Sequence, residues 1–158
     1  MTALTASQNE LLRATSRSFY LTLRVLPRAI RPQIALAYLL ARTADTIADT
    51  EIVPLNQRLE SLQKLRARVL DKNPNPAPLN FNNLAGKQGT EAEKLLLEKI
   101  NDSVGLLQAF SAEDQKLIRE VLATITSGQE LDLKRFAPLE KPEAAPQVIA
   151  LEDRKSVV

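Results

Sequence analysis

The chain of 158 residues contains no cysteine, no histidine and no tryptophan. Without cysteine there is no disulfide and no thiol nucleophile, and without cysteine and histidine there is no Cys/His zinc site. The lack of histidine also excludes a Ser-His-Asp triad and an imidazole general base. Any catalysis must therefore use Asp, Glu, Arg, Lys, Tyr or Ser, together with a hard cation such as Mg²⁺.

Glycine is scarce, with four residues, and no segment shows the alternation of apolar and polar residues that is typical of strands. No apolar run approaches the roughly 20 residues that cross a bilayer, and the first residues have no signal-peptide core. The 44% apolar and 25% charged residues are ordinary for a globular domain. We therefore expect an all-α, cytoplasmic protein, either soluble or peripheral to a membrane.

The net charge is only +2, and the arginines lie among apolar residues, so we expect no nucleic-acid partner. The distribution of charge is more informative, because residues 1–50 contain six arginines, no lysine and three acidic residues. Arginine suits bidentate recognition of phosphate, although a solvated face that happens to use arginine remains an equal alternative. The arginines are Arg13, Arg17, Arg24, Arg28, Arg31 and Arg42.

Caps and prolines divide the N-terminal part into expected helices. Ser7 is expected to cap a first helix that runs to about Ala14. Ser16 or Ser18 is expected to open a second helix, which stops before Pro27.

The later helices follow from the same signals. Pro32 suits the first turn of a third helix, and Pro54 opens an amphipathic fourth helix. A helical pattern covers about Ala92–Gln108, and Ser111 with Asp114 resembles a capping box before the last helix.

Two segments depart from the helical pattern. Residues 71–91 contain three prolines, five asparagines and two glycines, which predict a surface loop. Residues 137–158 begin with three prolines in ten residues and are expected to be an irregular tail.

The third helix is apolar over most of its surface, yet it carries Tyr38, Arg42, Asp45 and Asp49. At 100° per residue these four side chains fall within about 60° of one another, in one stripe. Two aspartates one turn apart repel, and Mg²⁺ bound with a substrate phosphate would offset that repulsion. The stripe therefore indicates a metal and phosphate site. In the alternative interpretation, Asp45 pairs with Arg42 and Asp49 merely lies near the helix end.

Two further segments carry polar groups of interest. Ser16-Arg17-Ser18 at a helix start presents hydroxyls, backbone N–H groups and a guanidinium, which suits an anion, or it is an ordinary N-cap beside an exposed arginine. Gly128 and Asp132 lie four residues apart in an apolar helix. The glycine favours close helix packing over room for a ligand.

Together these segments resemble the squalene/phytoene synthase family. Residues 15–27, TSRSFYLTLRVLP, resemble its N-terminal Ser-(Arg/Lys)-Ser-Phe segment. Residues 37–50, AYLLARTADTIADT, resemble its first aspartate-rich motif, and residues 128–133, GQELDL, resemble its Gly-x-x-x-Asp-Leu helix. The resemblance covers about residues 10–136, and it is strongest to the bacterial squalene synthase branch (farnesyl-diphosphate farnesyltransferase).

The resemblance implies an isoprenoid synthase-type helical bundle around an apolar cavity. It implies Mg²⁺-dependent head-to-head condensation of two farnesyl diphosphates to presqualene diphosphate, followed by NADPH reduction to squalene. Geranylgeranyl diphosphate with phytoene as the product is the alternative. It also implies roles for residues of the stripe and of the serine-rich segment: Asp45 and Asp49 as metal ligands, Tyr38 and Arg42 with them in catalysis, and Ser16, Arg17, Ser18, Tyr38 and Arg42 in substrate binding.

The sequence also departs from the family, because the second aspartate-rich motif is not present. We therefore expect residues 1–136 to be the N-terminal half of an isoprenoid synthase domain, an incomplete bundle without the C-terminal helices, as in a truncated product or a gene fragment. Such a chain is expected to be inactive alone and to self-associate through exposed apolar surface. The alternative function is a non-catalytic helical interaction module of the same family.

Overall fold

A computed structural model defines the fold, and it describes residues 4–73 and 76–135. Within these residues there are eight α-helices and no strand, which confirms the expected all-α class. The irregular tail expected at 137–158 lies outside the described residues.

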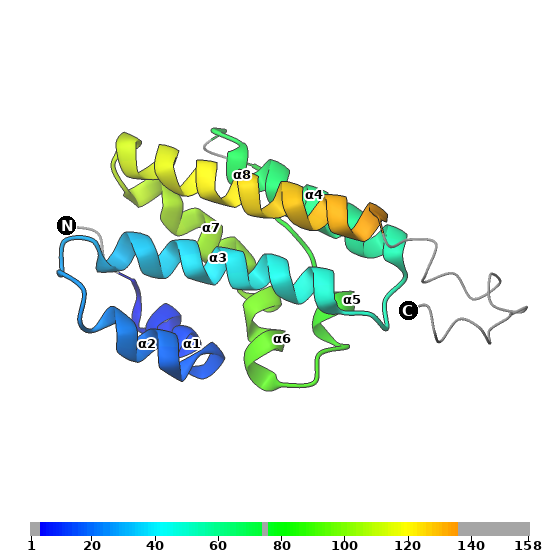
Figure 1. The fold of residues 1–158 in the computed structure, drawn as a ribbon, viewed down its shortest axis with the longest axis horizontal. Coiled ribbons are helices and arrows are strands. Elements are labelled where there is room, and N and C mark those ends of the chain that lie inside the picture. The colour runs from blue at the N-terminus through cyan, green and yellow to red at the C-terminus, as the bar shows by residue number, and fades with distance from the viewer. Residues whose placement is uncertain (1–3, 74–75, 136–158) are drawn as a thin grey trace, which may run out of the picture.

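Helix α3 (Arg31–Asp49) is the centre of the bundle (Figure 1). It packs against α4 (Leu55–Leu70) and α8 (Ala112–Arg135), which also pack against each other. Pro32 lies in the first turn of α3 and Pro54 is the N-cap of α4, so the two proline signals are confirmed.

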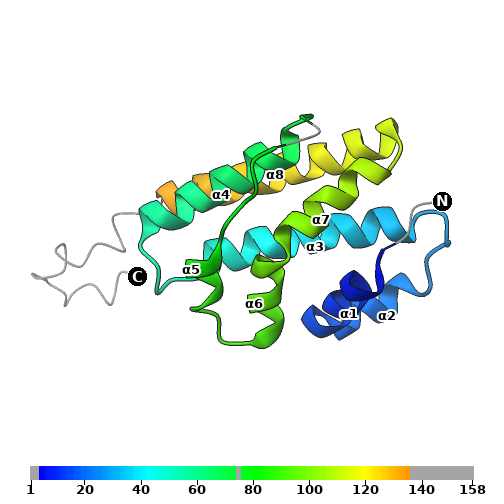
Figure 2. The same cartoon turned by 180° about the vertical axis from the view of Figure 1, so that it is seen from behind.

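The remaining helices cover the other sides of α3. Helices α1 (Ala6–Thr15) and α2 (Arg17–Leu23) form a hairpin against α3 and against α6 (Glu91–Glu98). Figure 2, seen from behind, shows α7 (Ile100–Leu106) crossing α3 and the short α5 (Asn82–Ala85) beside α6.

Two apolar clusters meet on α3. The larger cluster joins α3 to α4, α7 and α8, and the smaller joins it to α1, α2 and α6. From α3, Leu36 and Leu40 enter the larger cluster, whereas Ala35 and Leu39 enter the smaller one. Burial on two sides leaves a single stripe of α3 outside the core.

The first helix begins two residues earlier than the sequence predicts. Thr5, not Ser7, is its N-cap: the Thr5 hydroxyl accepts from the backbone N–H of Gln8, and the Gln8 carboxamide oxygen accepts from the Thr5 N–H. This reciprocal pair satisfies two N–H groups, whereas Ser7 is exposed in the first turn. The second helix is capped by Ser16, one of the two serines that the sequence offers for this role.

The described residues of the expected loop, 71–73 and 76–91, include the short helix α5 and the first residue of α6, and they are anchored to the core rather than lying wholly on the surface. Phe81 and Leu84 are buried. The Leu79 N–H donates to the Asn101 side chain, whose amide donates back to the Leu79 carbonyl, both at 2.8 Å. The helical pattern predicted over 92–108 is broken at Lys99, which separates α6 from α7.

The end of that pattern is a single 3₁₀ turn, Leu107–Ala109, before α8. The Ser111 hydroxyl accepts from the Asp114 N–H at 3.1 Å, so one half of the expected capping box is present. In the ranges 4–73 and 76–135, no helix has both the length and the apolar character that crossing a bilayer requires.

Candidate functional site

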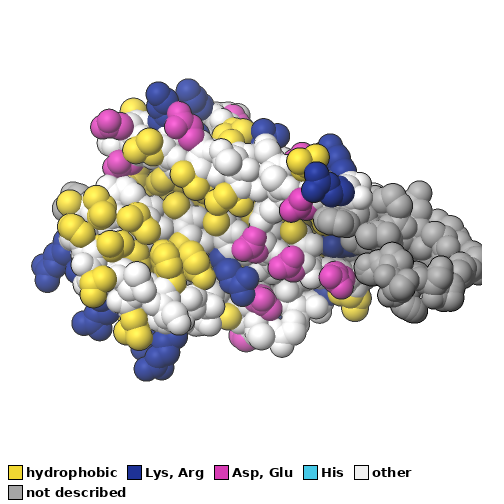
Figure 3. Space-filling view, in the orientation of Figure 1, with side chains coloured by type: hydrophobic (Ala, Val, Ile, Leu, Met, Phe, Trp, Pro, Cys, Tyr) yellow, Lys and Arg dark blue, Asp and Glu magenta, His cyan; other side chains and the backbone are white. Residues whose placement is uncertain are grey.

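The uncovered stripe of α3 faces outward between α2 and α8 (Figure 1). In the same orientation, Figure 3 shows apolar side chains gathered at one end of this face and acidic side chains at the other. Of the four polar residues predicted to share the stripe, Asp45 and Asp49 are exposed, and Tyr38 and Arg42 are partly buried. The face thus offers an apolar region that leads to a pair of carboxylates.

Asp45 is held by a residue of α8. The Gln129 carboxamide Nε2 donates a hydrogen bond to Asp45 Oδ1. Although Asp45 is exposed on one side, the protein atoms on its other side desolvate the carboxyl and raise its pKa. The neighbouring Asp49 carboxylate raises the pKa further, while Arg42 and the Gln129 hydrogen bond lower it. The repulsion predicted between the two aspartates is therefore present, and it favours a bound cation.

Arg42 is engaged by α6. Its Nη2 lies 3.2 Å from Glu93 Oε2, and Glu93 Oε1 accepts from the Thr90 hydroxyl at 3.2 Å. The interpretation in which Asp45 pairs directly with Arg42 is thus not what the structure has, because Arg42 pairs with Glu93 and Asp45 with Gln129. The Arg42 charge still acts on Asp45 at longer range.

A cavity of about 340 Å³ opens beside the two aspartates. Besides Asp45 and Asp49, its lining includes Gln129 and Asp132 of the GQELDL segment. The expectation of close packing at Gly128 is wrong, since a Cβ built there would meet no atom within 4 Å. The glycine therefore leaves open space on α8 next to the residue that holds Asp45.

Tyr38 connects the stripe to the second helix. Its ring stacks on Phe19, with centroids 3.9 Å apart and an interplanar angle of 13°. This stacking places the apolar part of the serine-rich segment against α3.

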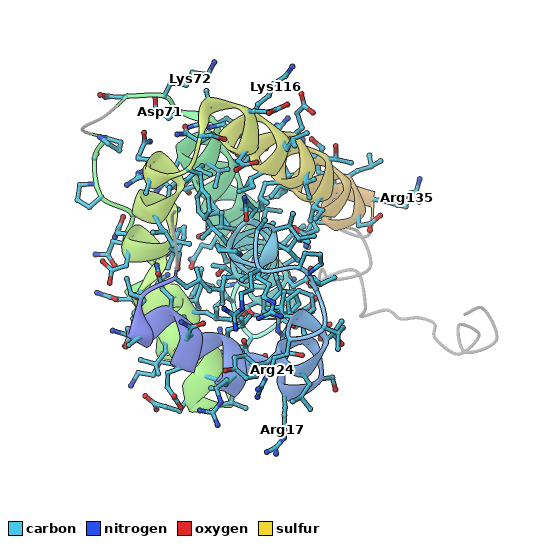
Figure 4. All side chains as sticks on the ribbon, turned by 90° about the vertical axis from the view of Figure 1, so that its left-hand side faces the viewer. Arg17, Arg24, Asp71, Lys72, Lys116 and Arg135 are labelled. Atoms are coloured by element: carbon cyan, nitrogen blue, oxygen red, sulfur yellow. The ribbon has the colours of Figure 1, made fainter. Side chains whose placement is uncertain are left out.

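The polar groups of that segment do not meet the aspartates. The Ser16 hydroxyl accepts from the Phe19 N–H at 3.2 Å, as an N-cap does. Arg17 and Ser18 are exposed, and Figure 4 shows Arg17 pointing away from the body of the bundle. Arg17 lines a separate cavity with Arg13 and Arg24.

The donor set near Asp45 and Asp49 fits a hard cation in part. Among the residues that the structure describes, no three carboxylate, histidine or cysteine groups come together to hold an ion. Mg²⁺ needs few protein ligands, because it prefers one or two carboxylates with phosphate oxygens and water. Asp45 and Asp49 are thus suited to Mg²⁺ that arrives with a phosphorylated ligand.

Sequence reasoning did not assign Gln129 and Glu93 to the site. Gln129 lies inside the GQELDL segment, between Gly128 and Asp132, so this motif is the sequence feature that could have indicated it. Glu93 had no comparable signal, since its contact with Arg42 spans 51 residues.

The all-α bundle is consistent with an isoprenoid synthase-type fold. A squalene/phytoene synthase family model matches residues 12–145, and the chain belongs to that family. The family comprises prenyltransferase-type enzymes of isoprenoid biosynthesis, which join two prenyl diphosphates head to head. Comparisons with curated proteins and with solved structures gave no match.

Proposed function

We propose that the face formed by α2, α3 and α8 binds Mg²⁺ and farnesyl diphosphate for head-to-head condensation to presqualene diphosphate and squalene. The observation that carries the proposal is the aspartate pair at one end of an apolar face. A prenyl diphosphate has the same division, with a charged head on an apolar chain. Asp45 and Asp49 would hold the cation, and the apolar region would hold the prenyl chain.

Each residue of the face would contribute in a distinct way. The cation supplies positive charge to the departing diphosphate. Gln129 orients Asp45 by donating a hydrogen bond to it, and the Arg42–Glu93 pair places a guanidinium near the same carboxylates. The stacked rings of Tyr38 and Phe19 form a wall that excludes water from a reacting allylic centre.

The proposed substrate is farnesyl diphosphate and the proposed product is squalene. Geranylgeranyl diphosphate with phytoene as the product is the alternative, and NADPH is needed only for squalene. We assign no described residue to NADPH binding. NADPH is therefore added to the assay as a co-substrate. The prenyl diphosphates are the proposed small-molecule partners.

A second candidate function is a non-catalytic helical interaction module. It is favoured by large apolar side chains that are exposed on α2, in the turns between α2 and α3, and on α8: Leu21, Val25, Ile30, Leu117, Val121 and Leu131. The two functions differ in their dependence on Mg²⁺, since an apolar interface needs no cation.

Titration of the chain with farnesyl thiodiphosphate, with and without Mg²⁺, tests the first function. We expect binding that requires Mg²⁺ and that weakens strongly in Asp45→Asn or Asp49→Asn, because each change removes charge while keeping the shape. Asp102→Asn, at an exposed position on α7, is the matched control. Equal binding with and without Mg²⁺ would contradict the proposed site and favour the interaction module.

Turnover is a separate measurement on the same chain, with farnesyl diphosphate, Mg²⁺ and NADPH. The described residues supply one carboxylate pair, whereas the reaction joins two diphosphate substrates, so we expect binding without squalene or phytoene. Formation of presqualene diphosphate would show that one aspartate pair is enough.

A further inference from the structure

The hairpin of α1 and α2 carries a basic surface that the proposed function does not use. Its exposed arginines are Arg13 of α1, Arg17 of α2, and Arg24 and Arg28 of the turn that follows. Between them lie two apolar side chains, Leu21, which is 52% exposed, and Val25, which is 80% exposed. We call these six residues the basic hairpin surface.

The helical spacing explains why these side chains share one side. Arg17, Leu21 and Arg24 are separated by four and three residues, which places them on one stripe of α2 and its last turn. Arg13 joins them from α1, since Arg13, Arg17, Leu21 and Arg24 all line one cavity of about 540 Å³. Glu10 is the acidic residue of that lining, so positive charge dominates.

The space-filling view agrees with this description. Figure 3 shows basic side chains along the edge that α2 occupies, with apolar side chains among them. Figure 4 shows Arg17 and Arg24 at the same end of the molecule, whereas Lys116 and Arg135 lie elsewhere on it.

Contacts within the protein explain Arg13 but not Arg24 and Arg28. Arg13 lies 3.5 Å from the Glu10 carboxylate and over the Tyr20 ring. Arg31, just beyond the basic hairpin surface, also has such contacts: its Nε donates to the Leu26 carbonyl and its Nη2 to the Arg24 carbonyl, both at 2.6 Å. By contrast, the Arg24 and Arg28 side chains make no hydrogen bond or ion pair within the described parts of the chain. Exposing the apolar Val25 side chain to water is unfavourable, and this exposure does not stabilise the fold.

We propose that the basic hairpin surface docks on an anionic lipid bilayer. Clustered basic residues are attracted to the negative leaflet, and each one near the surface strengthens binding about fivefold. Leu21 and Val25 stand where they enter the interface between headgroups, as apolar residues of peripheral proteins do. The charge favours anionic lipid over neutral lipid, and the exposed apolar side chains favour a bilayer over a free phosphate. The proposal does not depend on the condensation chemistry.

Sedimentation with vesicles tests it. The chain is mixed with vesicles of pure phosphatidylcholine or of phosphatidylcholine with phosphatidylglycerol. We expect binding to the anionic vesicles that decreases as salt is added, because exposed charges are screened. The double variant Arg24→Glu with Arg28→Glu should weaken binding at least about 25-fold, from two fivefold losses.

The matched control is Lys116→Glu with Arg135→Glu, which changes the net charge equally at exposed positions of α8. It should keep most of the vesicle binding. Val25→Ser should lower vesicle binding several-fold without changing the charge, whereas Leu131→Ser, another exposed apolar position, should not. Circular dichroism melts confirm that each variant is folded.

Three results would overturn the proposal: no binding of the wild-type chain to anionic vesicles, equal losses in the two charge variants, or no effect of Val25→Ser. Titration with inorganic diphosphate tests the alternative, in which the same arginines bind a soluble phosphate anion rather than lipid headgroups. Loss of diphosphate binding in Arg24→Glu with Arg28→Glu, with vesicle binding intact, would identify a soluble anion site instead of a membrane surface.

Discussion

Gln129 of α8 donates a hydrogen bond to the Asp45 carboxylate of α3, across 84 residues of sequence. The bond joins the GQELDL segment to the aspartate stripe, two of the three segments in which the sequence resembles its family. The Gln129 Oε1 atom is buried and has no hydrogen-bond partner among the described residues. The amide is therefore oriented chiefly by the carboxylate that it holds.

Gln129→Leu is expected to weaken Mg²⁺-dependent binding of farnesyl thiodiphosphate by roughly tenfold, the lower end of the range for removing a hydrogen-bond partner from a metal ligand. The bond both orients Asp45 and lowers its pKa, so its loss leaves a less suitable ligand. Titration calorimetry measures the change, with Gln57→Leu at an exposed position of α4 as the control. An unchanged affinity in a folded Gln129→Leu variant would mean that Asp45 binds the cation equally well without the hydrogen bond from Gln129.

Asp45→Asn is expected to stabilise the cation-free chain above the ordinary aspartate pKa. The pKa of Asp45 is raised from 3.8, first by burial and then by Asp49. A raised pKa means that the folded chain holds the proton more tightly, so the stability contributed by this group is present below pH 3.8 and is lost as pH rises through the folded-state pKa. Asp45→Asn has no carboxyl group to ionise, so its stability does not fall in this way as the pH rises.

The measurement is the urea midpoint of wild type and variant against pH. The stability of Asp45→Asn relative to wild type should increase as pH rises from 3.8, and then level off below about 1 kcal/mol, because an exposed carboxylate is screened by solvent. Mg²⁺ should stabilise the wild type selectively. A difference that shrinks with rising pH, or one that Asp102→Asn reproduces, would contradict the assignment.

Gly128 offers a test of whether the open space on α8 is used. Gly128→Ala should stabilise the chain by up to about 1 kcal/mol, because alanine is the better helix former and its Cβ would meet no atom within 4 Å. Gly105→Ala, at an equally open position, should give a similar gain in a thermal melt. Gly128→Leu should keep the stability but reduce binding of farnesyl thiodiphosphate. Undiminished binding would show that the ligand does not occupy that space.

Local patterns predicted much of the fold. Ser16 before Phe19, Pro32 in α3 and Pro54 before α4 act through bonds or sterics within one turn, so the sequence contains their full cause. Thr5 rather than Ser7 is the N-cap of α1, because Thr5 and Gln8 form a reciprocal pair of hydrogen bonds. That pairing is local as well, but it uses glutamine where glutamate is the more familiar signal.

Contacts between distant segments were harder to predict. The stripe of α3 follows from helical geometry, so Asp45 and Asp49 were found from the sequence. Gln129 and Glu93 reach that stripe through packing of α8 and α6 on α3, which periodicity does not encode. The outward direction of Arg17 likewise depends on how the α1–α2 hairpin sits on α3.

Arg58 fixes the end of the helix that carries the aspartates. It is 2% exposed, and its Nε and Nη1 donate to the carbonyls of Val53 and Ala48, both at 2.9 Å. Arg58→Ala should destabilise the chain by about 3 kcal/mol, because two charge-assisted bonds to buried carbonyls are lost. Chemical denaturation measures the change. Lys64→Ala removes an exposed ion pair with Glu60 and should cost less than about 0.5 kcal/mol; equal losses would contradict this account.

The apolar end of the proposed binding face predicts self-association. Leu117 and Val121 lie one turn apart on α8 and are 55% and 47% exposed, and Ile30 at the start of α3 is 42% exposed. Contiguous apolar surface of this kind favours association. Leu117→Glu with Val121→Glu should shift the chain to monomer, measured by light scattering over a concentration series.

The control for that experiment is Ile52→Glu with Leu70→Glu, which adds the same charge at two other exposed apolar positions. It should leave association unchanged. Because the prenyl chain and the second copy would cover the same apolar side chains, farnesyl thiodiphosphate with Mg²⁺ should dissociate the wild-type oligomer, whereas inorganic diphosphate with Mg²⁺ should not. Association that is unaffected by the prenyl ligand would place the interface elsewhere, and a wild-type chain that stays monomeric at every concentration would show that this face does not associate.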